Sequence, residues 1–206
     1  MVSSSFSLYR AFSLCTVFLL CSCSTSPKLT SKPNSEINPQ WRNHHNSVNA
    51  IKDWNFNGRF SANGTDESWN GNIVWKQKKQ DFEIQISGPL SSGSVKIEGN
   101  NEYAILTLGD DKTYSDENPE KLLEANTGLK LPLSDLQYWL RGIPAINTPN
   151  AKMQWHNNGH LKNLNQGGWK ISFRGYTKIN SIELPRKIFM QNSEYDVRLI
   201  IRNWHI

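Results

Sequence analysis

Apolar and polar side chains alternate along much of this 206-residue chain, which is the pattern of half-buried β-strands. The alternation begins at Trp54, breaks off after residue 115, returns at residue 152 and continues to Trp204. Loops within each part are too short for anything but antiparallel neighbours, because parallel strands need long crossover connections. The predicted strands, about eleven in all, are 54–62, 69–75, 82–86, 95–97, 103–108, 112–115, 152–155, 160–165, 169–176, 186–191 and 195–204.

Three segments outside the strands have the signals of helices. The first follows the capping residue Asn38 and has Pro39 at its first position. In the gap between the two groups of strands, one helix begins at Pro119 and stops at Gly128, and another spans 131–142. Helices this short cannot hold a core of their own, so they should cover the sheet. The chain is therefore predicted to be mainly β with helices (α+β), with one large, curved antiparallel sheet and helices on its concave side.

The start of the chain has the composition of a secretory signal. Arg10 is the only charge before an apolar run of about a dozen residues, too short to span a membrane. The run ends in Leu20-Cys-Ser-Cys23, which resembles a bacterial lipobox, with a small Ser22 before the cysteine that receives the lipid. We therefore expect residues 1–22 to be a lipoprotein signal peptide and Cys23 to be lipidated. An ordinary signal peptide with incidental cysteines is the alternative.

The rest of the chain is predicted to divide into a tether and one domain. Residues 23–38 are rich in Ser, Thr, Pro, Lys and Asn and cannot bury enough apolar surface to become ordered, so they form a lipid-anchored flexible tether. Residues 39–206 form a single domain that contains no cysteine and must be stable without disulfides. Ser24 is not the aspartate that retains bacterial lipoproteins in the inner membrane. The resemblance to such lipoproteins therefore favours the outer membrane, facing the periplasm.

Catalytic and metal-binding patterns do not stand out. Ser91-Ser-Gly-Ser94 lacks the G-x-S-x-G elbow, and no lysine follows at P-loop spacing. His156 and His160 enclose an Asn-Gly pair, which predicts a hairpin rather than a metal-binding helix. The net charge is +5, but basic and acidic residues interleave, without the Lys and Arg stripe of a nucleic-acid binder. We expect no enzyme, cofactor, metal or nucleic acid.

The loop from Ser87 to Ser94 has one residue that turn chemistry does not explain. Gly, Pro and Ser are expected there because they supply positive φ or fix φ near −65°. Leu90 is a large apolar side chain at the tip. It either folds back onto the strand pair or presents an apolar contact to a membrane or a lipid. The residue pattern leaves both interpretations open.

Taken together, these features resemble the LolB family of outer-membrane lipoprotein receptors. The resemblance covers essentially the whole chain after the signal, and one departure is Gly88, where Asn is expected before the Pro-Leu pair. Its most specific parts are the apolar loop and the segment 131–144. The matching stretches are the lipobox, Pro39-Gln-Trp-Arg42, Trp54 with Gly58-Arg-Phe60, Gly88-Pro-Leu-Ser-Ser92, Leu131-Pro-Leu-Ser-Asp-Leu-Gln-Tyr-Trp-Leu-Arg-Gly-Ile-Pro144 and Asn203-Trp204.

The resemblance implies an unclosed half-barrel with a helical lid over an apolar cavity, anchored in the outer membrane of a Gram-negative bacterium. Such a receptor accepts lipoproteins from the periplasmic carrier LolA, holds their acyl chains and inserts them into the membrane's inner leaflet. The membrane-insertion loop is Gly88, Pro89 and Leu90, and we expect a monomer. Candidate cavity residues are Phe56, Phe60, Trp69, Ile73, Trp75, Phe82, Ile84 and Ile86. Candidate lid residues are Leu133, Leu136, Trp139 and Leu140.

Two other functions use part of the same pattern. A carrier of a phospholipid or another lipid needs the apolar hollow but not the apolar loop. A hydrolase anchored at the outer membrane needs a nucleophile, a base and an acid that converge in the pocket.

Overall fold

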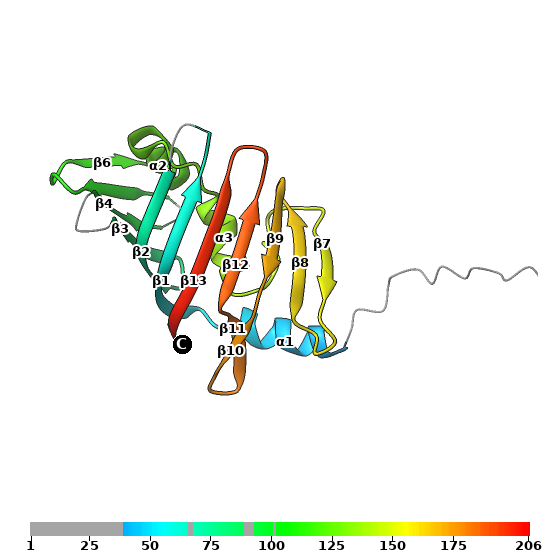
Figure 1. Ribbon diagram of the computed structural model, residues 1–206. Helices are drawn as coiled ribbons and strands as arrows, with labels where there is room; N and C mark the ends of the chain where they lie inside the picture. The colour runs from blue at the N-terminus through cyan, green and yellow to red at the C-terminus, as the bar shows by residue number, and fades with distance from the viewer. Residues whose placement is uncertain (1–38, 66–67, 89–92, 101) are drawn as a thin grey trace, which may run out of the picture. The chain divides into compact units, whose positions relative to one another are not determined.

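The computed structural model describes residues 39–65, 68–88, 93–100 and 102–206. In this part of the chain eleven strands form one antiparallel sheet, and a further hairpin forms a two-stranded sheet (Figure 1). The helices are α1 (Pro39–Asn49), α2 (Pro119–Thr127) and α3 (Leu133–Leu140). The strands are β1 (Asp53–Asn63), β2 (Ser68–Lys78), β3 (Asp81–Ser87), β4 (Ser94–Gly99), β5 (Ala104–Leu108), β6 (Thr113–Asp116), β7 (Lys152–Trp155), β8 (Leu161–Gln166), β9 (Trp169–Phe173), β10 (Tyr176–Ile179), β11 (Ile182–Pro185), β12 (Lys187–Gln191) and β13 (Asp196–His205).

The chain fills the sheet from the middle toward one edge and then from the other edge back to the middle. Strands β1 to β6 form a meander, and α2 and α3 follow. The chain re-enters at the opposite edge as β7 and returns through β8, β9 and β12 to β13, which pairs with β1. The strand order is β6-β5-β4-β3-β2-β1-β13-β12-β9-β8-β7, so the sheet stays open between β6 and β7. The predicted unclosed antiparallel half-barrel of about eleven strands is confirmed.

One predicted strand is wrong. The segment 169–176 was expected to be continuous, but β9 ends at Phe173 and Tyr176 begins β10, which pairs with β11 in the separate hairpin. Gly175 lies between them with φ +89°, a conformation that reverses the chain and that glycine adopts without strain. Trp169, Ile171 and Phe173 alternate, but Tyr176 is out of phase with them, so the sequence contained a break at this turn that the prediction overlooked.

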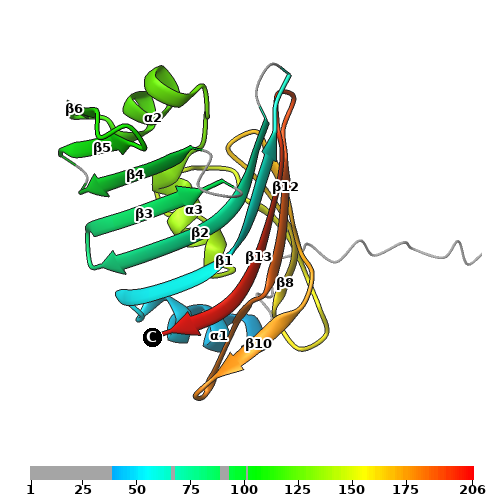
Figure 2. The same cartoon turned by 60° about the vertical axis from the view of Figure 1, so that its left-hand side comes forward.

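Two glycines allow the sheet to curve. Gly58 follows a register shift in the pairing of β1 with β13, and a Cβ there would meet the backbone oxygen of Ile200. Gly71 on β2 approaches the backbone oxygen of Ser87 in the same way. Bulges and close backbone approach of this kind bend a strand and increase its twist. Figure 2 shows the resulting curvature, with α3 inside the concave side of the sheet.

The two short helices between β6 and β7 have unequal local signals. The side-chain oxygen of Asn118 accepts hydrogen bonds from the backbone of Glu120 and Lys121, both at 3.0 Å, and Gly128 ends α2 with φ +72°. These boundaries agree with the prediction. Helix α3 is shorter than expected, and its N-cap residue Pro132 provides no side-chain hydrogen bond. Its first turn must therefore be satisfied from elsewhere in the fold.

Candidate functional site

An apolar cavity lies between the concave face of the sheet and the two helices α2 and α3. Its volume is about 10 Å³, which is at most enough for one water molecule. An acyl chain cannot enter such a space unless the helices move. The structure therefore describes a closed state, in which sheet and lid pack on each other. The lining side chains are all apolar: Phe60, Ile73, Trp75, Ile84, Ile86, Val95, Ile97, Leu123, Leu131, Leu133, Leu136 and Leu199.

Five of the eight candidate cavity residues line this space. The other three lie elsewhere in the described chain. Phe56 is buried in an aromatic group, with ring centroids 6.2 Å from Trp54 and 5.2 Å from Trp204. Trp69 is half-buried near the start of β2, and Phe82 is half-buried at the start of β3. The lining five are Phe60, Ile73, Trp75, Ile84 and Ile86.

The candidate lid residues divide between two environments. Leu133 and Leu136 line the cavity, whereas Trp139 and Leu140 are buried but do not line it. Further lining residues were not among the candidates. Val95 and Ile97 are on the β4 strand that alternation predicted, so their position on the apolar face could be inferred from the sequence. Leu199 comes from the distant β13 and needed the pairing of β13 with β1, which no local pattern supplies. The remaining lining residues are Leu123 and Leu131.

A buried glutamine fixes one side of α3. The side-chain oxygen of Gln166 accepts from Trp139 Nε1 and from the Ala145 backbone, both at 2.9 Å. Its amide nitrogen donates to the Ala145 carbonyl at 2.9 Å and to the Thr148 carbonyl at 2.5 Å. Every hydrogen-bonding position of this side chain is thus used, which makes its burial favourable. Gln166 connects α3 and the loop after it to β8, and sequence reasoning missed it.

Arg141 fixes the other end of α3. It is buried, and its guanidinium donates to the backbone oxygens of Ile51 at 2.8 Å, Gln137 at 3.1 Å and Val48 at 3.4 Å. Burial lowers its pKa from 12.5 to about 10. Within the described residues Arg141 forms no ion pair with a carboxylate. Its charge is compensated by the carbonyl groups at the C-terminal end of α1, where the helix dipole is negative.

The first turn of α3 is satisfied by α2. The carboxylate of Glu120 accepts from the Ser134 backbone at 2.9 Å and from the Ser134 hydroxyl at 2.5 Å. Asp135 in the same turn accepts from the Thr148 hydroxyl at 2.7 Å, and burial raises the pKa of this carboxyl. Polar contacts therefore hold the ends and the flank of the lid. The centre of the lid, over the cavity, rests on apolar contacts alone.

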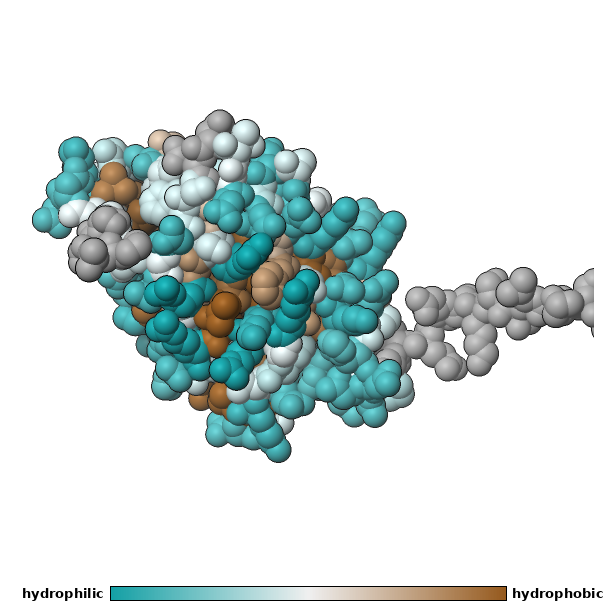
Figure 3. All heavy atoms as spheres, viewed as in Figure 1, coloured by the Kyte–Doolittle hydropathy of each residue, from teal (hydrophilic) through white to brown (hydrophobic). Residues whose placement is uncertain are grey.

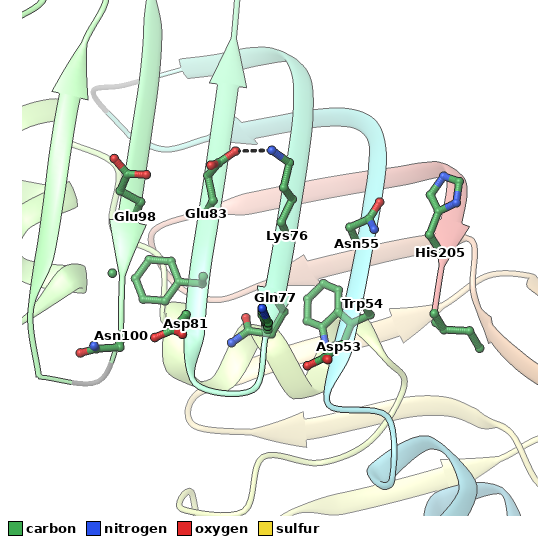
Figure 4. Close-up of a pocket in the computed structure, with 14 residues that line it drawn as sticks. Asp53, Trp54, Asn55, Lys76, Gln77, Asp81, Glu83, Glu98, Asn100 and His205 are labelled. Carbon is green, nitrogen blue, oxygen red and sulfur yellow. Dashed lines mark hydrogen bonds and ion pairs between the residues drawn. The ribbon is translucent and has the colours of Figure 1, made fainter.

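A second hollow, about 770 Å³ in volume, lies at the ends of β1 to β4 and is lined by charged and amide side chains as well as Trp54 and Phe82. Figure 4 shows Lys76 and Glu83 reaching toward each other from β2 and β3, with nitrogen and oxygen 2.7 Å apart. Here Phe82 is placed among polar groups, outside the closed cavity. Its many charged and amide side chains do not suit the binding of acyl chains.

A cluster of histidines lies where α1 meets the β7–β8 turn and the β10–β11 hairpin. His160 Nε2 is 3.1 Å from a carboxylate oxygen of Glu183, and its ring stacks on Tyr176 at 4.4 Å. The ring of His44 is 4.5 Å from that of His160. Burial, with the neighbouring histidines second, lowers the pKa of His44 to about 4, so the ring is neutral near pH 7.

The predicted hairpin from His156 to His160 is confirmed: the backbone of His156 donates to the His160 carbonyl at 2.8 Å. The described residues contain no group of three or more metal-ligating side chains. In the same part of the chain, no helix has both the length and the apolar character needed to cross a membrane. The proposed lipidation site Cys23 and the loop residues Pro89 and Leu90 lie outside the described residues, as do the predicted segments 1–22 and 23–38, whereas Gly88 is described.

The fold and its cavity define a class: unclosed antiparallel half-barrels whose apolar interior is covered by helices. A DUF1329 family protein from Desulfovibrio piger has a similar fold, with a TM-score of 0.53 at 10% identity over 82% of this chain and 92% of that one.

Residues 52–204 match the family model for the outer membrane lipoprotein LolB. The outer-membrane lipoprotein LolB of Nitrosococcus oceani is 33% identical, covering 94% of this chain and 95% of that protein. The LolB of Pseudomonas fluorescens is 32% identical, covering 80% of each. The chain belongs to the LolB family and is an outer-membrane lipoprotein.

Proposed function

We propose that this protein accepts lipoproteins from the periplasmic carrier LolA, holds their acyl chains under the α2–α3 lid and inserts them into the inner leaflet of the outer membrane. The lipid on Cys23 anchors it there, and it catalyses no chemical reaction. The observation that carries this proposal is the all-apolar cavity on the concave side of a half-barrel whose family is named for an outer membrane lipoprotein.

The closed cavity gives the proposal its energetics. Burying acyl carbons is worth about 0.8 kcal/mol per CH₂, so a long chain transferred from water would bind very tightly. Here the chain must displace lid contacts that are themselves apolar, such as those of Leu133 and Leu136. Binding then exchanges one apolar contact for another, and only the difference remains as affinity. A receptor that must release its cargo into a bilayer benefits from this lower affinity.

Transfer needs no chemical energy under these conditions. Cargo moves from LolA to the receptor if the receptor binds the acyl chains more tightly, and from the receptor to the bilayer if the bilayer is more favourable still. The apolar tip Leu90 would bring the cavity to the leaflet, so that the chains cross with little exposure to water.

The test uses the mature chain with Cys23→Ala, which cannot be lipidated and contains every described residue. It is mixed with a purified LolA–lipoprotein complex, and the position of the lipoprotein is followed by co-purification. We expect the lipoprotein to move to the receptor and to displace an apolar fluorescent probe from the cavity. A protein that ignores the complex but binds free phospholipid would be a lipid carrier of another class, and the proposal would be wrong.

A further inference from the structure

The convex face of the sheet carries an unbalanced set of positive charges. Residues 141–206 contain ten Lys and Arg against three Asp and Glu, whereas residues 39–140 contain ten against fourteen. Charge asymmetry between two halves of a chain is typical of proteins that contact an anionic surface. Arg141 is buried and Lys178 lies in the separate β10–β11 hairpin, and the other eight cations lie on or beside β7, β8, β9, β12 and β13, on one side of the strand order.

The register of the strands places the cations next to one another. Ile200 on β13 lies opposite Arg59 on β1 and opposite Lys187 on β12. Two pairs further along, Arg198 on β13 lies opposite Phe189 on β12. The three charged side chains and Ile200 are exposed because alternate residues of these strands point away from the helices. Figure 3 shows this face, where apolar side chains lie in the middle of polar ones.

Phe189 lies between two guanidinium groups. The Arg174 guanidinium is 4.6 Å from the centre of the ring and that of Arg198 is 6.0 Å from it. Stacking of this kind holds arginines over an aromatic ring and leaves their N–H groups free to donate outward. Ile200, which is 41% exposed, adds an apolar contact beside them. We call Arg59, Arg174, Lys187, Arg198, Phe189 and Ile200 the basic strip.

The neighbouring half of the convex face is different. On β2, β3 and β4 two lysines pair with glutamates, Lys76 with Glu83 at 2.7 Å and Lys96 with Glu98 at 2.8 Å, while Lys78 forms no ion pair among the described residues. In the basic strip the only ion pair among the described residues joins Arg198 to Asp196, at 3.6 Å. The two halves share the same strand geometry and exposure. Their difference in charge therefore does not follow from the architecture of the sheet.

We propose that the basic strip docks on the anionic phospholipid headgroups of the leaflet in which the protein is anchored. Cations mixed with exposed apolar side chains on a broad face suit a lipid interface, where phosphates are spread over a surface. A flexible tether of residues 23–38 would hold the domain at a root-mean-square distance of about 20–24 Å from its anchor, so the leaflet is at high effective concentration. Docking would fix the orientation of the half-barrel on the membrane. This docking proposal rests on the membrane anchor of the proposed function but not on lipoprotein transfer.

The test measures binding of the mature Cys23→Ala chain to vesicles by sedimentation, without any lipoprotein. Vesicles of phosphatidylcholine mixed with phosphatidylglycerol should bind the chain, and vesicles of phosphatidylcholine alone should bind it much more weakly. Each cation near an anionic surface strengthens binding about five-fold, so the variant R59Q/K187Q should bind about 25-fold more weakly. Binding should be lost at about 1 M salt, where the Debye length is about 3 Å.

The matched control is K76Q/K96Q, which removes the same charge from the balanced half of the same face. It should weaken vesicle binding by less than about three-fold, because these lysines already pair with glutamates. Inorganic phosphate should not displace the vesicles, since the cations are spread along strands rather than gathered around one ion.

Equal effects of the two double variants would overturn the proposal, and so would equal binding to both kinds of vesicle. If R59Q/K187Q weakened binding to LolA but left vesicle binding unchanged, the strip would recognise an acidic protein surface, and the proposal would again be wrong. These variants leave the cavity unaltered, so they should still take a lipoprotein from LolA. Failure of the docking proposal is therefore distinguishable from failure of the proposed function.

Discussion

Single residues decide whether the cavity can be both stable and useful. Arg141 and Gln166 are polar, buried and hydrogen-bonded, and each joins α3 to a part of the chain distant in sequence. Leu90 is the opposite case, an apolar residue in a loop whose composition favours polar and flexible residues. Residues of both kinds break the simple pattern of apolar inside and polar outside. Such exceptions are more informative about function than the pattern itself.

Leu90→Glu should leave folding and uptake of lipoprotein from LolA intact while blocking transfer into liposomes. A carboxylate cannot enter the hydrocarbon region at low cost, so the loop loses its apolar contact. Transfer is measured by flotation of the lipoprotein with liposomes, and Leu90→Ile is the matched control that should retain it. Normal transfer by Leu90→Glu would contradict the role given to Leu90 and would favour the interpretation that this leucine packs on the strand pair.

Arg141→Met should lower the free energy of unfolding by about 2–4 kcal/mol, because the carbonyls of Val48 and Ile51 lose a buried charged donor. Methionine keeps much of the packing against Trp54 and Tyr138, so the loss reports the hydrogen bonds. The measurement is denaturant unfolding. Arg42→Met, on the exposed side of α1, is the control and should change stability by less than about 0.5 kcal/mol. A loss as small as that of the control would mean that Arg141 does not hold the helices together.

Among elements, the lid is the one that has to move in the proposed function. Its flank is clamped by Gln166 and its ends by Glu120 and Arg141, while its centre contacts the sheet through apolar side chains. An opening that keeps the clamps and separates the centre gives up only contacts that an acyl chain can replace. The polar clamps thus limit how far the lid can open.

Gln166→Leu should loosen α3. The substitution leaves Trp139 Nε1 and the backbone of Ala145 and Thr148 without partners, at a cost of about 2–4 kcal/mol. Hydrogen exchange should then be faster in α3 than in β1, and an apolar fluorescent probe should enter the cavity sooner. Gln154→Leu on the exposed strand β7 is the control, because it loses only a contact with Asn163. Uniform acceleration over the whole sheet would indicate global destabilisation instead of lid opening.

At the scale of the whole molecule, the sheet brings together regions that are far apart in the chain. Strand β13 closes against β1, and the cations of the basic strip gather on the convex face, so that the two faces of the sheet have different partners in our two proposals. The cluster of His44 and His160 lies where α1 packs beside β11. That junction makes stability depend on pH.

Acid should destabilise the domain through His44. Burial lowers its pKa from 6.5 to about 4, and its Nε2 is buried without a hydrogen-bond partner in the described part of the chain. The folded state therefore binds this proton less readily than the unfolded chain does. The stability that comes from keeping His44 neutral is fully present above pH 6.5, is lost as the pH falls and is gone below about pH 4. Its size is about 2 kcal/mol after allowance for the partly exposed ring, or roughly 4–8 °C in Tm.

The variant His44→Phe keeps the ring contacts with His160 and Tyr176 and should flatten the dependence of Tm on pH between 6.5 and 4. Burial also lowers the pKa of His160, while the facing carboxylate of Glu183 raises it, so a smaller dependence should remain. His205→Phe at the exposed C-terminal end is the control. If both variants gave the profile of the unmodified protein, His44 would not be the source of acid sensitivity.

Local patterns determined most of the elements. Alternation located the strands, Asn118 and Gly128 marked α2, and the number of strands in the main sheet followed from the count of alternating segments. The failure at Gly175 is local as well, because the apolar positions change phase between Phe173 and Tyr176 where the chain turns out of the sheet. Five of eight candidate cavity residues line the closed cavity for the same reason: residues two apart on a strand share a face.

What only the tertiary structure decided involves residues distant in sequence. The excess of basic residues after residue 141 is visible in the sequence, but the basic strip forms only when β1, β12 and β13 lie side by side. Gln166 and Arg141 look like ordinary surface residues until their partners are placed around them. The sequence by itself determined which faces are apolar, because that follows from a short repeat. Packing decided how far the cavity closes and which polar groups clamp it, because those depend on contacts across the whole fold.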